Sequence, residues 1–365
     1  MCYGRINNNK KTEEKYIIMS SKKQTSKKKK VLKVLLGILI ALLIIILAAG
    51  GTGFWYISNK FGKMQQVKID ESQLSVSDNK NLAQYRNIAI FGVDSRADDY
   101  GKGNRSDCII IASINNKTHD VKLISVYRDT YVNISGHGLD KITHAYSYGE
   151  APLALKTLNE NLDLNIKEFV TVNFDSVSDA VDALGGIKMS VTDAEVRYIN
   201  GYIDETSKVT GKKSNHITKA GTYNLDGVQA VAYSRIRYTA GGDYKRTERM
   251  RDVISAMLAK LKTKGVGEIN KIADKVLPQV YTNLSMSDLI SMAPTVASFN
   301  VAESIGWPYK TNGKVINKVW YGIPITLESN VERLHKEAFK DEKYVVPASI
   351  KTTSQQIVNK SGYSK

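Results

Sequence analysis

Residues 235–251 hold the densest cluster of side chains suited to binding an anion. Five arginines, one lysine and an aspartate fall within these seventeen residues. A guanidinium group presents a planar fork of N–H donors that matches phosphate oxygens two at a time, whereas a lysine offers a single hydrated charge. The segment therefore predicts a site for a phosphate or a diphosphate. The competing interpretation is a solvated basic surface or a face that binds nucleic acid.

The expected local structure favours the first interpretation. If residues 234–238 are extended, Arg235 and Arg237 lie on one face of a strand and can reach the same ligand. If a helix starts near residue 243, Arg246 and Arg249 open a stripe that continues with apolar residues and points toward a pocket. Arg251 lies roughly 140° around such a helix from Arg246 and is expected to face water.

Four shorter polar clusters follow or precede predicted strands, where an open α/β sheet places its ligand. They are residues 92–96, 105–107, 125–130 and 140–146. A single aspartate after a strand is commonly a turn residue, but here Asp94, Asp107 and Asp129 each lie within two residues of an arginine. Carboxylates bind divalent cations and guanidinium groups bind phosphate oxygens, which together is what phosphoryl transfer requires.

A membrane anchor is predicted near the N-terminus. Residues 34–57 carry no charge and consist mostly of Leu, Ile, Val, Ala and Gly, so as a helix they can cross a hydrocarbon core of about 30 Å. The stretch exceeds the apolar core of a cleaved signal peptide, which favours a retained signal anchor. By the positive-inside rule, the lysine-rich residues 1–33 stay cytoplasmic. We therefore expect a single-pass protein of the cell membrane with an extracellular C-terminal domain.

The basic composition has the same explanation. Residues 1–33 contain ten Lys, one Arg and two Glu, a net charge of +9 out of +16 for the whole chain, which leaves +7 for the other 332 residues. Much of the positive charge is thus a topology signal, and an exported domain does not meet duplex DNA, so no nucleic-acid partner is expected. With only Cys2 and Cys108 available, no disulfide is expected and the exported domain must be held by its own core.

The fold is predicted to be α/β, with a central mixed β-sheet covered by helices on both faces. Short β-branched runs predict strands at residues 87–93, 108–114, 121–126 and 169–173, and helices are expected at 151–162, 174–184 and up to about residue 264. Residues 201–219 are expected to form a polar excursion and 295–345 strands and loops. The predicted organisation is a stalk at 58–84, the extracellular domain at 85–345 and a disordered tail at 346–365.

Eight segments in this order resemble the LytR-CpsA-Psr family, enzymes of Gram-positive envelopes that move glycopolymers from a polyprenyl-diphosphate carrier onto peptidoglycan. The resemblance covers roughly residues 87–261. The matching segments are residues 92–96, 105–107, 125–130, 140–146, 181–187, 225–227, 233–237 and 243–249. Two positions depart from the family pattern, because Tyr127 stands where a proline is usual and Met250 where a glutamine is usual. Met250 removes an amide that could have bound a ligand.

The resemblance implies roles for most of these charged residues. Mg²⁺, or Mn²⁺, is expected on Asp94 and Asp107. Direct contacts to the diphosphate are expected from Arg128, Arg235, Arg237 and Arg246, and secondary contacts from Arg96, Arg105, Lys141 and Arg249. Either Asp129 or one of the metal-site aspartates is expected to accept the proton of an attacking sugar hydroxyl.

The implied activity is an Mg²⁺-dependent phosphotransferase. It would attach a glycopolymer such as wall teichoic acid or capsular polysaccharide to a peptidoglycan sugar hydroxyl. The alternatives are a non-catalytic envelope regulator that binds polyprenyl phosphates and a polyprenyl-diphosphate hydrolase. The lipid requires an apolar groove, for which the stripe from Val253 to Leu261 and the helix ending at Leu184 are candidates, although both also suit ordinary core packing.

Overall fold

The computed structural model describes residues 64–93, 95, 100–261, 263–285, 288 and 300–364. The predicted anchor at residues 34–57, the basic tail at 1–33, and the site residues Asp94 and Arg96 lie outside these ranges. Within the described ranges, no helix is both long enough and apolar enough to cross a membrane.

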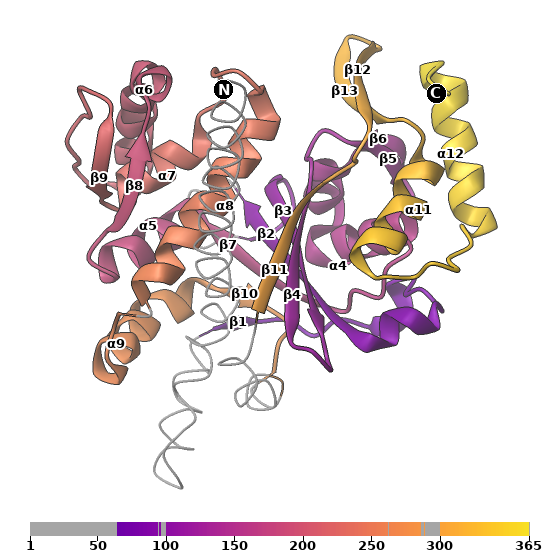
Figure 1. Cartoon of the computed structure of the whole chain (residues 1–365), viewed down its shortest axis with the longest axis horizontal. Helices are drawn as coiled ribbons and strands as arrows, with labels where there is room; N and C mark the ends of the chain where they lie inside the picture. The colour runs from indigo at the N-terminus through magenta and orange to yellow at the C-terminus, as the bar shows by residue number, and fades with distance from the viewer. Residues whose placement is uncertain are drawn as a thin grey trace, which may run out of the picture.

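A seven-stranded mixed sheet forms the centre of the fold, in the order β1-β10-β7-β2-β3-β4-β11 (Figure 1). Its strands are β1 (Gln65–Gln66), β2 (Tyr85–Val93), β3 (Ser106–Asn115), β4 (Asp120–Val126), β7 (Glu168–Asn173), β10 (Tyr281–Thr282) and β11 (Asn300–Trp307). β2 pairs parallel with β7 and antiparallel with β3, and β4 pairs antiparallel with β3 and parallel with β11. The carboxyl ends of β2, β4, β7 and β11 therefore meet the amino end of β3 at one edge of the sheet.

Two-stranded ribbons and helices surround this sheet. The ribbons are β5 (Tyr131–Ile134) with β6 (Gly138–Lys141), β8 (Ile187–Val191) with β9 (Gly221–Leu225), and β12 (Thr311–Ile316) with β13 (Val319–Pro324). The α-helices are α4 (Ile142–Leu162), α5 (Phe174–Ala183), α6 (Asp193–Thr210), α7 (Gly227–Arg235), α8 (Gly242–Leu261), α9 (Val266–Val276), α11 (Leu327–Ala338) and α12 (Ala348–Ser361). Short 3-10 helices lie at Glu71–Gln73, Lys80–Gln84 and Leu277–Gln279.

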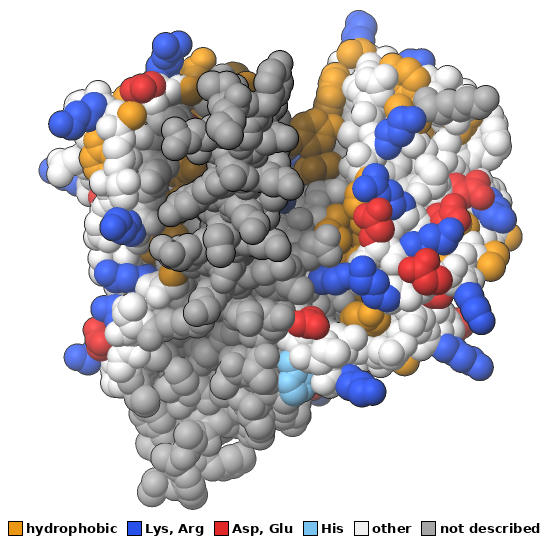
Figure 2. Space-filling model, in the orientation of Figure 1, with side chains coloured by type: hydrophobic (Ala, Val, Ile, Leu, Met, Phe, Trp, Pro, Cys, Tyr) orange, Lys and Arg blue, Asp and Glu red, His pale blue; other side chains and the backbone are white. Residues whose placement is uncertain are grey.

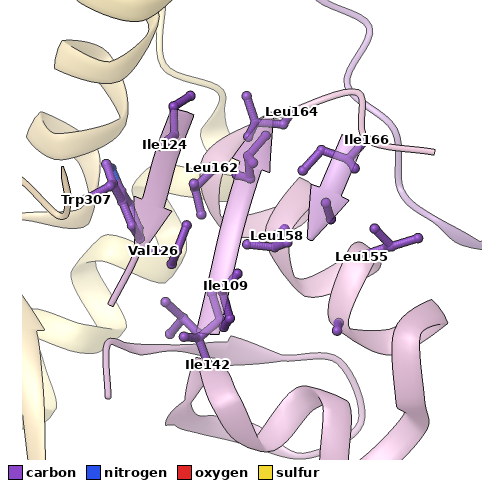
Figure 3. Packing of buried hydrophobic residues seen from close by; sticks show 14 of the residues in the cluster. Ile109, Ile124, Val126, Ile142, Leu155, Leu158, Leu162, Leu164, Ile166 and Trp307 are labelled. Atoms are coloured by element: carbon purple, nitrogen blue, oxygen red, sulfur yellow. The ribbon is translucent and has the colours of Figure 1, made fainter. Parts of the chain in front are cut away.

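Two hydrophobic cores divide the molecule. The larger core joins the strands to α4, α11 and α12, and Figure 3 shows part of it around Ile109 of β3, Leu158 of α4 and Trp307 of β11. The smaller core joins α5, α6, α7 and α8 to the β8–β9 ribbon. In Figure 1 the helices of the two cores stand on opposite sides of the sheet. The predicted α/β fold with a central mixed sheet is thus confirmed.

The four predicted strands are confirmed as β2, β3, β4 and β7. Three other local predictions are wrong. Residues 234–238 do not form a strand, because α7 continues through Arg235 and the residues that follow it belong to no strand. The polar excursion at 201–219 begins as the second half of α6, whose buried residues Ile199, Ile203 and Thr206 recur at helical spacing. The stretch 295–345 contains the helix α11 as well as strands.

Both ends of the predicted domain also need correction. The described part of the stalk, from residue 64, packs on the domain, with Leu74 and Leu82 fully buried in the larger core. The tail at 346–365 is not a disordered segment, because α12 packs against α4 and α11 and buries Ile350 and Ile357. The folded domain therefore extends from residue 64 to residue 364 in the part of the chain that the structure describes.

The packing of α12 gives a stability test. Ile357 is 1% exposed, so Ile357→Ala should lower the free energy of unfolding by about 3 kcal/mol through lost burial and the cavity left behind. Gln356→Ala, one residue earlier on the exposed side of the same helix, should change it by less than about 0.5 kcal/mol. Urea unfolding of the full chain in detergent measures both values. Equal stability of the two variants would mean that the tail is not packed.

Candidate active site

The turn after β4 carries two of the predicted site residues and is fixed from two directions. The carbonyl oxygen of Arg128 accepts a hydrogen bond of 3.1 Å from the backbone N–H of Thr143, in the first turn of α4. The carbonyl oxygen of Asp129 accepts one of 2.9 Å from the N–H of Gly322 in β13. These bonds, which come from separate elements, hold the backbone at 128–129 and so set the directions of both side chains.

Three arginines gather around two carboxylates at this edge of the sheet. Arg128 Nη1 donates to Asp107 Oδ1, and Arg237 Nη2 lies 3.5 Å from Asp107 Oδ2. On α8, Arg246 Nη2 donates to Asp243 Oδ2 at 2.9 Å, and Arg237 Nε lies 3.7 Å from Asp243 Oδ1. We call Arg128, Arg237 and Arg246 the cation cluster. Its positive charge exceeds the negative charge of the two carboxylates that hold it.

The cation cluster contains buried donors that protein groups do not satisfy. Arg246 is 2% exposed, and the Nε atoms of Arg246 and Arg128 are buried without a hydrogen-bond acceptor among the described residues. Burial lowers the pKa of Arg246, as do the nearby charges of Arg237 and Arg128, while Asp243 opposes them. Unsatisfied buried donors of like charge are unfavourable, so an anionic ligand with several acceptor oxygens would stabilise this arrangement.

Asp129 lies beside the cation cluster. Its Oδ1 atom is 2.8 Å from Lys141 Nζ and 3.7 Å from Arg128 Nε. Lys141 Nζ in turn lies 5.7 Å above the ring of Tyr321 in β13. The Asp129 carboxylate is therefore placed between two cations at the carboxyl end of β4, a position suited to receiving a proton from a bound hydroxyl.

A polar cavity of about 560 Å³ opens next to the cation cluster. It is lined by Asp107, Phe174, Arg197, Tyr198, Gly201, Tyr202, Glu205, Arg235, Arg237, Tyr238, Arg246 and Met250. Arg235 Nη1 donates to Thr206 at 3.1 Å and its guanidinium lies 5.0 Å from the Phe174 ring centroid, so it forms one wall. The cavity lies between α6, α5, the α7–α8 connection and the edge of the sheet.

The wall formed by α6 was missed from the sequence. Arg197, Tyr198, Tyr202 and Glu205 all line the cavity, and they lie on the helix whose second half was predicted as an excursion. The signal for this helix was present in the sequence, because Thr192 and Glu195 form a capping box at its start.

An apolar crevice of about 70 Å³ adjoins the polar cavity and shares Asp107, Phe174 and Met250 with it. The other lining residues are Ile90, Gly92, Val93, Cys108, Val172, Asn173, Val177, Val231, Ser234, Val253 and Ile254. The crevice lies between the sheet and the helices α5, α7 and α8. Val253 belongs to the predicted groove stripe and Val177 to the helix predicted to end at Leu184. Burial raises the pKa of the Cys108 thiol to about 12.

Comparison with known proteins identifies the family. A model of the LytR_cpsA_psr family matches residues 52–338. The chain belongs to this family. It is 33% identical over 264 residues to the polyisoprenyl-teichoic acid–peptidoglycan teichoic acid transferase TagT of Bacillus subtilis (strain 168), a match that covers 70% of this chain and 79% of TagT. The resemblance stated from the sequence is thereby confirmed.

Solved structures of the family share the fold. The structure of TagT bound to LI-WTA is 30% identical, with a TM-score of 0.54, and the match covers 75% of this chain and 93% of that chain. The structure of the LytR-CPS2A-psr family protein YwtF (TagT) with bound octaprenyl pyrophosphate lipid is 27% identical, with a TM-score of 0.52, and the match covers 81% and 100%. Members of this family have therefore been observed with a lipid diphosphate and with LI-WTA.

Two predicted ligand contacts within the family motifs have other surroundings in the structure. Arg249 is 1% exposed, and its guanidinium donates to Glu195 at 2.8 Å, to the carbonyl of Ile236 at 3.0 Å and to Thr239. In place of the predicted diphosphate contact, Arg249 thus joins α8 to α6. Arg105 is exposed just before β3 and does not line the polar cavity.

The prediction that Arg251 faces water is wrong. It is half-buried, and its Nη1 atom donates to Ser125 Oγ of β4 at 2.9 Å. Its charge is also close enough to Cys108 to oppose the effect of burial on that thiol. Arg251 therefore connects α8 with the sheet beneath the cation cluster.

The contributions of Arg249 and Arg237 to the free energy of unfolding can be compared. Arg249→Met leaves the buried carboxylate of Glu195 unpaired and should lower the free energy of unfolding by about 3 kcal/mol. Adding Glu195→Gln should recover part of this loss because it removes the uncompensated charge. Arg237→Met, at a side chain that is 43% exposed, should cost less than about 1 kcal/mol. Urea unfolding of the full chain gives all three values, and an undiminished stability of Arg249→Met would show that the residue is not structural.

Proposed function

We propose that this chain transfers a glycopolymer, such as wall teichoic acid or capsular polysaccharide, from a polyprenyl-diphosphate carrier to a sugar hydroxyl of peptidoglycan. The observation that carries the proposal is the cation cluster, where the buried Nε donors of Arg128 and Arg246 have no acceptor among the described residues. A polar cavity and an apolar crevice meet at this point. A lipid diphosphate matches this combination, because one molecule joins a dense anion to an apolar chain. Its family relative TagT is named as a transferase of this kind.

The proposal matches each part of the donor to one part of the site. The diphosphate lies on the cation cluster, the first part of the polyprenyl chain enters the crevice, and the sugar end occupies the polar cavity. Because Asp107, Phe174 and Met250 line both hollows, the junction between lipid and phosphate lies beside them. The crevice is narrow, at about 70 Å³, so the apolar side chains that line it must rearrange to admit the lipid.

In the reaction, the acceptor hydroxyl attacks the phosphorus next to the polymer, and the bond from that phosphorus to the bridging oxygen breaks. The products are a polymer joined to the acceptor by a phosphodiester and a polyprenyl phosphate. Negative charge moves onto the bridging oxygen in the transition state, where the guanidinium groups of the cation cluster stabilise it. Asp129 takes the proton of the hydroxyl, and Lys141, 2.8 Å from its carboxylate, holds it in position.

A divalent cation fits the carboxylate of Asp107. This residue lines both hollows, so its hard carboxylate oxygens lie beside the proposed position of the phosphates. Each oxygen faces a guanidinium of the cation cluster, and a bound cation would replace the weaker of these contacts, the one to Arg237 at 3.5 Å. Among the described residues, no three acidic, histidine or cysteine side chains cluster as a metal site, and the second predicted ligand, Asp94, lies outside them. The remaining ligands would come from the diphosphate. Mg²⁺ or Mn²⁺ held there would neutralise phosphate charge.

The same proposal includes the location of the protein. The uncharged segment at residues 34–57 anchors the chain in the cell membrane, with the basic residues 1–33 in the cytoplasm and the domain outside. The donor is confined by its lipid to the same membrane surface, so anchoring raises the frequency of encounter.

The transferase assignment is tested by removing one member of the cation cluster. Arg237→Ala in the full chain should reduce transfer from a synthetic polyprenyl-diphosphate disaccharide to a peptidoglycan oligosaccharide by about 100-fold or more, because it removes a preorganised cation from the transition state. Arg333→Ala, at an exposed residue paired with Glu337 on α11, is the matched control and should keep wild-type transfer. Product formation is followed by mass spectrometry. Wild-type transfer by Arg237→Ala would remove the cation cluster from the mechanism.

The metal is tested separately. Chelation with EDTA should abolish transfer, and added Mg²⁺ should restore it. Asp107→Asn should raise the Mg²⁺ concentration needed for half-maximal transfer by about tenfold or more, because an amide oxygen is a weaker ligand than a carboxylate. Transfer that is indifferent to EDTA would exclude the metal and leave the guanidinium groups to carry the charge alone.

A further inference from the structure

The β12–β13 ribbon stands out from the domain next to the active site and carries exposed apolar side chains. Trp320 is 46% exposed, Val315 61% and Val319 39%. Figure 1 shows the ribbon extending beyond the neighbouring helices, and Figure 2 shows hydrophobic side chains along its upper part. Its two-residue turn, Asn317 and Lys318, has positive φ at both positions, as a tight hairpin requires.

The indole of Trp320 lies across the backbone of the ribbon. Gly313 pairs with Gly322, and a Cβ atom added to Gly313 would lie 2.8 Å from Trp320 Nε1 and 3.1–3.2 Å from two ring carbons. A Cβ atom at Gly322 would lie 3.7 Å from Trp320 Cη2. The two glycines therefore provide the space in which the ring rests on the backbone. One face of the indole is covered and the rest is exposed, which creates a flat aromatic platform.

The platform is directed toward the reaction centre. Side chains alternate along a strand, so Trp320 shares its face of the ribbon with Thr311 on β12. Thr311 lies near Tyr244, because its side chain opposes the rise that burial causes in the pKa of Tyr244, which follows Asp243 in the first turn of α8. On the same face, the position of a Gly322 Cβ atom is 3.6 Å from the carbonyl oxygen of Asp129. Gly322 thus lies between the aromatic platform and the backbone of Asp129, the proposed general base.

We propose that Trp320 and its neighbours form the binding site for a sugar ring of the glycan strand that supplies the acceptor hydroxyl. This inference rests on the proposed transferase function and adds the position of the second substrate. One face of a pyranose ring presents C–H bonds that pack on the electron-rich face of an indole. Thr311 provides a hydroxyl group on the same face of the ribbon, 3.6 Å from the position of a Gly322 Cβ atom, and Tyr244, 44% exposed, provides a second near Thr311, as a polar but uncharged ligand requires.

The geometry favours a saccharide over a lipid bilayer as the occupant. A hairpin that inserts into a membrane by its tip carries apolar side chains there, but the tip here consists of the polar Asn317 and Lys318. The Trp320 ring is folded back over Gly313 and Gly322, and Gly322 on this face lies next to the carbonyl oxygen of Asp129. An acceptor held on the platform would bring a hydroxyl near the proposed base, whereas a bilayer there would obstruct it.

A kinetic experiment on the full chain tests the platform. Trp320→Ala should raise the KM for a peptidoglycan oligosaccharide by about tenfold, equivalent to about 1.4 kcal/mol of binding free energy, while the KM for the lipid-linked donor changes by less than about twofold. Trp320→Tyr keeps an aromatic face and should stay within about threefold of wild type. Gly313→Ala should resemble Trp320→Ala, because the added methyl group displaces the ring. Val319→Ala, at an exposed residue on the other face of the ribbon, is the control and should transfer normally.

A binding experiment without donor separates this inference from the transferase assignment. Chitotetraose, a tetramer of N-acetylglucosamine, is titrated into the full chain in detergent, and Trp320→Ala should weaken its binding about tenfold. Trp320-dependent binding would support the platform even if the wild-type chain transferred no polymer, a result that would overturn only the transferase function. Unchanged affinity and unchanged acceptor KM in Trp320→Ala would overturn the platform. It would also be overturned if this variant lost only binding to phosphatidylglycerol vesicles, since a membrane would then be the occupant.

Discussion

Electrostatic repulsion within the cation cluster is the constraint on which the rest of this structure depends. Arg237 and Arg128 lie close enough to Arg246 to disfavour its charge, while the carboxylates of Asp107 and Asp243 oppose that effect. Such an arrangement persists only when each arginine is fixed by a rigid element. β4 and α4 fix the first, and α8 fixes the third. The repulsion that remains is the energetic reason for this site to prefer a multivalent anion.

The ion pair between Arg249 and Glu195 explains how α8 withstands this repulsion. Both side chains are almost completely buried, and their contact at 2.8 Å joins α6 to α8 through residues that are 54 positions apart in the sequence. Arg251 adds a second connection, from the same helix to Ser125 on β4. Two of the five arginines of residues 235–251 therefore hold α8 in place and leave the others free to face the ligand. An arginine-rich segment in a phosphate site thus combines binding and structural side chains, which composition alone does not distinguish.

The sequence predicted the central sheet and the family, but not which arginines have a structural role. Continuous apolar runs such as residues 108–114 admit one interpretation as buried strands, and these predictions were correct. The assignment of residues 234–238 to a strand failed because the decisive signal was eight residues upstream, where Asp226 and Gln229 form the capping box of α7. The role of Arg249 depends on Glu195, a distant partner that helical periodicity cannot identify. The helix α12 was likewise missed, because the tail is mostly polar and few apolar residues of α12, among them Ile350 and Ile357, are buried against the domain.

The strand order places the two proposed substrates on opposite sides of the cation cluster. The apolar crevice lies over β7, β2 and β3, where Val172, Ile90 and Cys108 line it. The β12–β13 ribbon meets the domain at the other side, where Gly322 pairs with Thr130 just after β4. Asp107 of β3 and Arg128, just after the adjacent β4, lie between these two positions. The acceptor sugar would therefore approach the phosphorus from one side, and the polyprenyl phosphate would leave from the opposite side. In-line displacement at phosphorus requires that geometry. The sheet has the lipid crevice at one side and the acceptor platform at the other. This arrangement provides the in-line geometry without a large rearrangement of the catalytic residues.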